Sequence, residues 1–209
     1  MKTLINGRWT DRKEEKQSND GSFKRKDTEF RNWITPDGSP GETGVGGFKA
    51  ESDRYHLYVS LACPWAHRTL IFRKLKNLEP HIGVSIVHPI MLENGWKFGT
   101  DFSQCTGDQI LGKNSIFEVY LAADKNITSR ASVPVLWDVK QATIVSNESS
   151  EIIRMFNSAF EQISVNELDL YPRTLRTEID ELNAMIYDDV NNGVYKTGFA
   201  TSQKSYTES

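Results

Sequence analysis

Residues 55–68 read YHLYVSLACPWAHR, and this stretch decides the fold. Residues 55–60 alternate and are rich in aromatic and β-branched side chains, which predicts a strand. From 66 to 78, apolar residues recur at helical spacing, and Pro64 suits the first position of that helix. Cys63 is therefore predicted to lie between the end of a strand and the N-terminus of a helix.

The centre of the chain continues this pattern of strands and helices. A second strand is predicted at 83–88 and a short helix at 115–123. Residues 133–138 and 142–145 read as a hairpin, and Ser146 can cap a helix from about 147 to 160. The order β-α-β-(α)-β-β-α predicts an α/β domain over residues 54–162.

The two flanks of this domain have different patterns. Residues 1–53 are rich in Gly, Pro and Ser, and predict an irregular N-terminal extension. After Asp169 the spacing of apolar residues changes to that of a long amphipathic helix, which is expected to reach Gly193. Another helix is expected near Thr201, so residues 170–209 predict the start of an all-helical domain. The aromatic anchors expected to hold the extension are Phe23, Phe30, Trp33 and Phe48.

Composition excludes several classes of function. The formal net charge is −3 over 209 residues, without the basic excess of a nucleic-acid-binding protein. No stretch is apolar for the length of a membrane span, and the first residues lack the apolar run of a signal peptide. The two cysteines, Cys63 and Cys105, fit reduced thiols in a cytosolic protein, and Cys105 lies in a polar loop that predicts no catalytic role.

Cys63 is the candidate nucleophile. The N–H groups and the dipole of a helix N-terminus favour a thiolate, so the pKa of Cys63 is expected below its free value of about 8.5. Ala66 stands where a dithiol motif has its second cysteine, so a second thiol must come from solution, and glutathione is the candidate. A small buried hydrophobic cysteine is the alternative. His67 and Arg68, which follow, are given no role.

Residues 57–68 closely resemble the active-site segment of the glutathionyl-hydroquinone reductases, the xi-class glutathione transferases, which are omega-like. The resemblance extends from about Gly21 to Ser209. It implies an α/β thioredoxin-like N-terminal domain followed by an all-α glutathione transferase C-terminal domain. Members of the family continue past this endpoint, so the second domain is expected to be incomplete. Further segments that carry the resemblance are 95–96, 132–138, 147–152 and 193–200.

The resemblance also implies a glutathione site. Pro134 is expected after a cis peptide bond, with the Val133 backbone pairing with the cysteinyl part of glutathione; an ordinary trans proline is the alternative. Glu148 and Ser149 match the pair that binds the γ-glutamyl group, with Glu148 taking the ammonium and Ser149 the carboxylate. Taken alone, these two residues would read as a capped helix start.

Three more residues receive roles from the resemblance. Trp96 would wall the glutathione site, and Arg130 suits a carboxylate of glutathione. Tyr195 resembles a tyrosine of the hydroquinone pocket, whose hydroxyl could protonate the substrate. Taken alone, these would be a half-buried tryptophan, a surface arginine and a packing tyrosine.

The activity implied is glutathione-dependent reduction of glutathionyl-hydroquinones. Cys63 attacks the sulfur of the conjugate, hydroquinone leaves, and a second glutathione releases GSSG from the mixed disulfide. The alternatives are an omega-like thiol transferase or dehydroascorbate reductase, or a truncated glutathione-binding module. The implied partners are glutathione and glutathionylated quinones, with no metal, nucleic acid or membrane. The family implies a homodimer, which a shortened chain puts in doubt, and a cytoplasmic location.

Overall fold

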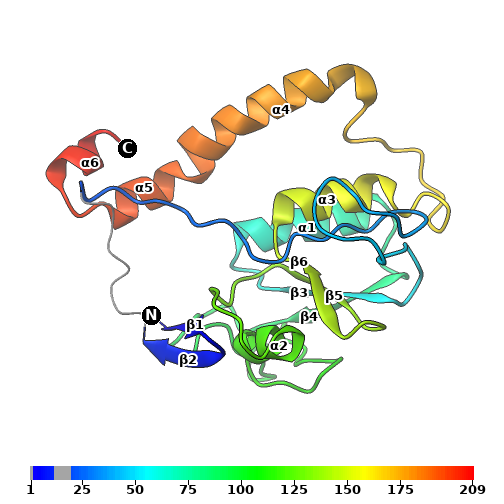
Figure 1. Cartoon of the computed structure of the whole chain (residues 1–209), viewed down its shortest axis with the longest axis horizontal. Coiled ribbons are helices and arrows are strands. Elements are labelled where there is room, and N and C mark those ends of the chain that lie inside the picture. Colours follow the sequence, from blue (N-terminus) through cyan, green and yellow to red (C-terminus); the bar gives the residue numbers. More distant parts are fainter. Residues whose placement is uncertain (1, 12–19) are drawn as a thin grey trace. The chain divides into compact units, whose positions relative to one another are not determined.

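The alternating residues at 55–59 form the central strand of a four-stranded sheet. The computed structural model describes residues 2–11 and 20–209 (Figure 1). The sheet has the order β4-β3-β5-β6, in which β3 and β4 are parallel and the other two neighbouring pairs are antiparallel. Its strands are β3 (Tyr55–Val59), β4 (Ile82–Ile86), β5 (Val135–Asp138) and β6 (Thr143–Ser146).

Three helices cover this sheet. Figure 1 shows α1 (Pro64–Leu75) and α3 (Ser149–Ser158) on one face and α2 (Ile116–Ala123) on the other. Helix α1 makes the crossover between the parallel strands β3 and β4, a connection that parallel strands require. The predicted order of strands and helices is confirmed, and the arrangement is that of a thioredoxin-like domain.

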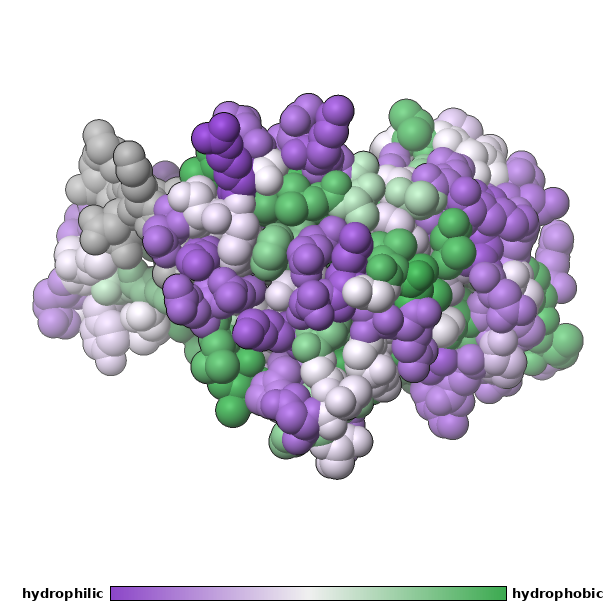
Figure 2. All heavy atoms as spheres, turned by 90° about the horizontal axis from the view of Figure 1, so that it is seen from below, coloured by the Kyte–Doolittle hydropathy of each residue, from purple (hydrophilic) through white to green (hydrophobic). Residues whose placement is uncertain are grey.

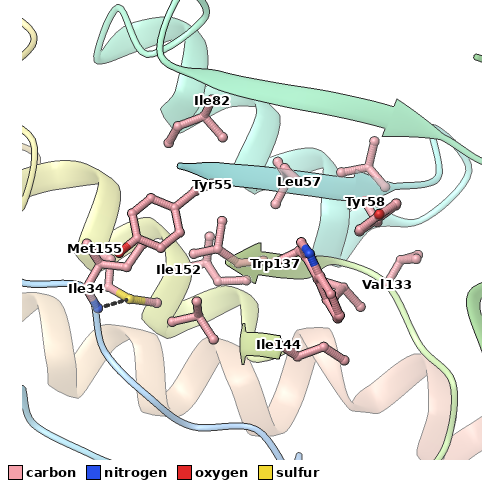
Figure 3. Packing of buried hydrophobic residues seen from close by; sticks show 14 of the residues in the cluster. Ile34, Tyr55, Leu57, Tyr58, Ile82, Val133, Trp137, Ile144, Ile152 and Met155 are labelled. Carbon is pink, nitrogen blue, oxygen red and sulfur yellow. Dashed lines mark hydrogen bonds between the residues drawn. The ribbon is translucent and has the colours of Figure 1, made fainter. Parts of the chain in front are cut away.

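The core fills both faces of the sheet, against α1 and α3 on one side and against α2 on the other. Every residue of β3 is buried, as expected for a strand covered on both faces. Figure 3 shows Tyr55 of β3 beside Ile34 and Met155, with Ile152 of α3 next to them, whereas Trp137 of β5 lies near Tyr58 and Val133. The backbone N–H of Ile34 points to the Met155 sulfur at 3.0 Å, so the segment before β3 closes the edge of this core.

The expectation of an irregular extension over residues 1–53 is corrected at its beginning. Two short antiparallel strands, β1 (Lys2–Ile5) and β2 (Arg8–Asp11), form a hairpin there. Asn6 and Gly7 make the turn with φ of 47° and 74°, the left-handed pair that favours a two-residue hairpin. A Cβ on Gly7 would lie 1.8 Å from the Lys125 carbonyl oxygen, so only glycine fits.

Contacts divide the described chain into two units, and the extension is shared between them. The first unit contains the hairpin and Thr28–Asp169, and the second contains residues 20–27 and Leu170–Ser209. Of the expected anchors, Trp33 and Phe48 are buried in the first unit, where Phe30 contacts Tyr120 edge-on. The fourth, Phe23, lies in the second unit, so the extension is not one separate segment.

The second unit is helical and departs from the expected single long helix. Helix α4 passes into a π-helical segment, and a further helix begins at Gly193, where the long helix was expected to end. The elements are η1 (Arg173–Leu175), α4 (Arg176–Met185), η2 (Ile186–Asn191), α5 (Gly193–Phe199) and α6 (Gln203–Thr207).

Several large apolar side chains remain at the surface. Leu175, Leu182 and Val190, part of the predicted apolar stripe, are 47%, 51% and 65% exposed. On the face seen in Figure 2, hydrophobic residues form separate patches among hydrophilic ones. Among the described residues, no helix combines the length and the apolar character that crossing a bilayer requires.

Candidate active site

Cys63 occupies the N-cap of α1, as predicted. Its backbone is extended, with φ of −101° and ψ of 114°, and Pro64 begins the helix. The Cys63 carbonyl accepts the first helical hydrogen bond, from the His67 N–H at 2.9 Å. The peptide N–H groups at this end of α1 have no partners within the helix, and with the helix dipole they favour a negative charge.

The peptide before Pro134 is cis, as the resemblance implied, and it lies beside the cysteine. The Cys63 thiol is 3.5 Å from the Val133 carbonyl oxygen, to which it donates. Val133 is buried, and its position is fixed between the loop after α2 and the start of β5. The structure thus brings Cys63 and Val133 together, while the pairing of Val133 with glutathione stays a prediction.

Glu148 and Ser149 lie together at the N-terminus of α3. Glu148 is the N-cap residue, and its Oε1 accepts from Ser150 N at 3.1 Å and from Ser150 Oγ at 2.8 Å. Ser149, the first helical residue, is buried. The predicted cap, Ser146, is corrected: it ends β6, and its hydroxyl accepts from Glu148 N at 3.1 Å instead.

Asn147 explains why the helix begins later than predicted. Its side chain donates to the Tyr120 hydroxyl at 2.9 Å and accepts from Phe30 N at 3.2 Å. These two contacts hold the residue before Glu148 in the core, out of the helix. The acidic–serine pair is therefore presented on a backbone that α2 and the N-terminal segment both fix.

Arg68 joins α1 to α3 and was not predicted to have a role. Its Nε and Nη2 donate to Ser149 Oγ at 3.0 and 2.7 Å, and Nη2 lies 3.8 Å from Glu148 Oε1. The guanidinium carbon lies 5.0 Å from the centre of the Trp65 ring. Arg68 is the last residue of the segment 57–68 that carries the resemblance, which is the only sequence signal for it, because its partner Ser149 is 81 residues away.

Trp96 and Arg130 lie on the two segments that flank α2. Trp96 packs against the core, and its carbonyl accepts from Ile116 N at 3.0 Å, which ties it to the first turn of α2. Arg130 is half-buried in the loop that leads to Val133. Their proposed contacts with glutathione stay predictions.

Tyr195 belongs to the second unit, on α5. Its ring stacks on Phe23 and on Phe199, with centroids 5.9 and 6.3 Å apart. The guanidinium carbon of Arg25 lies 4.4 Å from the Tyr195 ring centre, and Arg25 Nε donates to Asn192 Oδ1 at 2.6 Å. The tyrosine is therefore held by the segment 20–27, and its catalytic role stays a prediction.

Cys105 has the environment of an unreactive thiol. It lines a pocket of about 230 Å³ whose other wall includes Leu61 and Ala62, directly before Cys63. Burial, and beside it the Asp101 carboxylate, raise the pKa of the Cys105 thiol. Because the thiolate is the reactive form, this environment agrees with the expectation that Cys105 is not the nucleophile.

Comparisons with known proteins agree with this geometry. A model of the glutathione S-transferase N-terminal domain matches residues 62–159. The glutathionyl-hydroquinone reductase YqjG of Escherichia coli is 60% identical over 208 residues, covering 100% of this chain and 63% of that protein.

Two solved structures are also similar over nearly the whole chain. The glutathione-bound structure of YqjG from Escherichia coli has a TM-score of 0.87 and 57% identity, covering 99% of this chain and 61% of that one. The Xi class glutathione transferase from Natrialba magadii has a TM-score of 0.90 and 45% identity, covering 100% and 62%.

The chain thus spans less than two thirds of the length of these relatives. The match nevertheless includes the strand, the cysteine, the cis-proline loop and the start of α3 that form the candidate site, together with the helical region that follows. The chain belongs to the glutathione transferase family, and within it to the Xi class.

Proposed function

We propose that this chain carries the glutathione-binding and thiol centre of a glutathionyl-hydroquinone reductase, with Cys63 as the nucleophile. One observation carries the proposal: the Cys63 thiol lies at the N-cap of α1 and 3.5 Å from the Val133 carbonyl on a cis peptide. The similarity to YqjG, a protein named for this activity, supports the choice of reaction.

The reaction exchanges a carbon–sulfur bond for a sulfur–sulfur bond. The Cys63 thiolate attacks the sulfur of the conjugate, and the electron pair of the broken C–S bond stays on the ring carbon. That carbon takes a proton, for which Tyr195 is the proposed donor, and hydroquinone leaves. A second glutathione thiolate then attacks the mixed disulfide, releasing GSSG and the Cys63 thiolate. The ring gains two electrons, and two glutathione sulfurs lose them.

The glutathione site is proposed along the edge formed by the cis-proline loop and α3. The Val133 backbone pairs with the cysteinyl part, while Glu148 and Ser149 take the γ-glutamyl ammonium and carboxylate. Arg130 offers a guanidinium to a carboxylate of glutathione, and Trp96 forms a wall. The N-terminus of α3 adds partial positive charge beside the γ-glutamyl carboxylate.

The cell compartment and assembly follow from the same proposal. The small number of cysteines, Cys63 and Cys105, supports a reducing compartment such as the cytoplasm. The proposed partners are glutathione and glutathionylated quinones or hydroquinones, and the homodimer that the family implies is proposed for its full-length members only.

An omega-like thiol transferase, or a dehydroascorbate reductase, is the second candidate. The reason is that the thiol and the proposed glutathione-binding residues all belong to the first unit: Cys63, Val133, Glu148 and Ser149. Tyr195, the proposed proton donor, belongs to the second unit. Exchange with a disulfide needs the thiol and the glutathione site, without a proton donor for carbon.

The test measures glutathionylation of Cys63 together with the products that are released. The protein is mixed with a glutathionyl-hydroquinone and examined by mass spectrometry, while released hydroquinone and GSSG are quantified. We expect one added glutathionyl group on Cys63, and equal amounts of the two products. Cys63→Ser should lower turnover by roughly 1,000-fold or more, and Cys105→Ser should leave it nearly unchanged.

The outcomes separate the candidates. Reduction of a glutathione mixed disulfide without release of hydroquinone would favour the thiol transferase. Full turnover by Cys63→Ser would remove both proposals.

A further inference from the structure

We propose that Arg68 is a positioning residue of the glutathione site, which presets the Ser149 hydroxyl to donate to the γ-glutamyl carboxylate. The inference rests on the proposed binding of glutathione at Glu148 and Ser149. It adds a residue that reaches this site from α1, the helix that begins at the nucleophile.

The hydrogen-bond count at Ser149 carries the first step. A serine hydroxyl has one hydrogen to donate and two lone pairs with which to accept. Arg68 directs two N–H groups at the Ser149 oxygen, from Nε at 3.0 Å and Nη2 at 2.7 Å. Both lone pairs are then engaged, and the hydroxyl can act toward a ligand only as a donor. A carboxylate is a group that only accepts, so the preset hydroxyl matches it.

Charge carries the second step. The Arg68 guanidinium lies 3.8 Å from the Glu148 carboxylate, so the site presents one positive and one negative group side by side. The γ-glutamyl end of glutathione has an α-ammonium and an α-carboxylate on one carbon. The site is therefore complementary to a zwitterion, whereas Glu148 alone would repel the carboxylate that Ser149 is proposed to bind.

The packing of α1 holds Arg68 in this position. Helices α1 and α3 lie side by side on one face of the sheet (Figure 1). The neighbours of Arg68 along α1, Ala66 and Thr69, are fully buried, and the guanidinium stacks over Trp65. The side chain thus has one well-supported direction, toward the start of α3. One helix then carries both the nucleophile, at its N-cap, and the residue that orients the glutamyl pocket.

The experiment compares two ligands by calorimetry. Glutathione is set against 4-aminobutyryl-cysteinylglycine, which keeps the amine and lacks only the α-carboxylate. The variants are Arg68→Met, Arg68→Lys and, as the matched control, Lys74→Met. Lys74 is an exposed cation on the same helix, paired with Glu79 at 2.7 Å.

Arg68→Met should weaken glutathione binding by roughly 10- to 100-fold, the scale of a charge-assisted hydrogen bond. Its affinity for the analogue should change by less than about twofold, because the analogue lacks the group that the preset hydroxyl binds. Arg68→Lys should restore part of the glutathione affinity, since it keeps the charge and loses the planar fork. In turnover, the KM for glutathione should rise while kcat at saturation stays, and Lys74→Met should behave as the parent.

Equal losses for both ligands would show that Arg68 only packs the helices together, and would overturn the inference. Unchanged glutathione affinity in Arg68→Met would do the same while leaving the proposed function intact. Absence of glutathione binding in the parent protein would instead remove the proposed function and this inference with it. If Arg68→Met does not fold, the same two ligands are compared with Arg68→Lys. This variant should lose less affinity for glutathione than Arg68→Met would, and no affinity for the analogue.

Discussion

His56 is a titratable side chain enclosed within the first unit. It lies on β3, is 3% exposed, and shares a hydrogen bond of 2.8 Å with Ser85 Oγ. Its ring meets Tyr58 edge-on at 5.0 Å. Burial lowers the pKa of His56 to about 4, and the charges of Asp108 and Arg73 have smaller, opposite effects. The folded protein therefore holds this imidazole neutral well below the pH at which an unfolded chain would protonate it.

The direction of the pH effect follows from this depressed pKa. Between about pH 6.5 and about pH 4, the unfolded chain binds a proton that the folded chain does not, so the free energy of unfolding falls as pH falls. From pH 7.5 to pH 5 the loss should be about 2 kcal/mol. His56→Gln, which cannot titrate, should remove this part of the pH dependence in urea unfolding, and His67→Gln, at an exposed position of α1, should keep it. A parent and a His56→Gln variant with the same pH slope would contradict the assignment.

Single residues differ in how far the sequence could place them. Cys63 was predicted at a helix start because the strand, the proline and the helix are all local patterns. Val133 and the pair at 148–149 required the family resemblance, since nothing local brings the residues around 133 to a cysteine 70 positions earlier. Arg68 was missed because an arginine on a helix gives no local sign of what it faces.

Among the elements, the segment before β3 is joined to the end of β5 by a buried ion pair. Arg54 donates from Nε and Nη2 to Asp138 Oδ2 at 3.0 and 2.6 Å, and the two residues are 6% and 0% exposed. Nη2 also donates to the Gly47 carbonyl at 2.8 Å. The other oxygen of Asp138 accepts from Lys140 N at 2.8 Å, which shapes the turn into β6.

Asp138→Asn should lower the free energy of unfolding by about 3 kcal/mol, because it removes the buried counter-charge of Arg54 and leaves only the Glu51 carboxylate, 2.9 Å from Nη1. The amide still offers an oxygen to the turn, so the loss reports chiefly on the charge. The matched control is Glu79→Gln, which breaks an exposed pair with Lys74 and should cost less than about 1 kcal/mol. Urea unfolding of both variants measures the difference. Equal losses in the free energy of unfolding would show that the buried Arg54–Asp138 pair stabilises the fold no more than the exposed pair does.

The elements that the sequence predicted poorly have identifiable causes. The hairpin at 2–11 was read as irregular, although Asn6-Gly7 between two short strands is a hairpin signal. Helix α3 starts two residues later than predicted because tertiary contacts of Asn147 outweigh the local capping preference of Ser146. The core strands, by contrast, were found, because a strand buried in a sheet has a dense aromatic and β-branched pattern of its own.

For the molecule as a whole, the second unit depends on a segment from near the start of the chain. Arg25 contacts the Tyr195 ring and donates to Asn192, and Phe23 stacks on Tyr195. Asn192 is buried, so its hydrogen bond is shielded from water. Residues 20–27 therefore supply packing that the helical residues after Leu170 do not supply themselves.

Arg25→Ala should loosen α5 while the sheet stays intact. The loss of a cation–π contact and a shielded hydrogen bond should raise amide exchange in residues 193–199 by roughly tenfold or more. Protection in β3 and β5 should not change, because these strands belong to the other unit. Lys24→Ala, which removes the same charge at an exposed neighbouring position, is the control. Exchange that rises equally in the strands and in α5 would show that the two units open together.

The sequence separation of these contacts sets an order of events during synthesis. Ser202 and Ser205 donate to the Asp20 carbonyl across 182 and 185 positions, and Arg25 meets Asn192 across 167. At about 5–20 residues per second, a ribosome needs roughly ten to forty seconds to make that length of chain. All strands of the four-stranded sheet emerge within this interval. Residues 20–27 thus leave the ribosome early. They can contact Asn192, Ser202 and Ser205 only after all strands of the sheet have been synthesised.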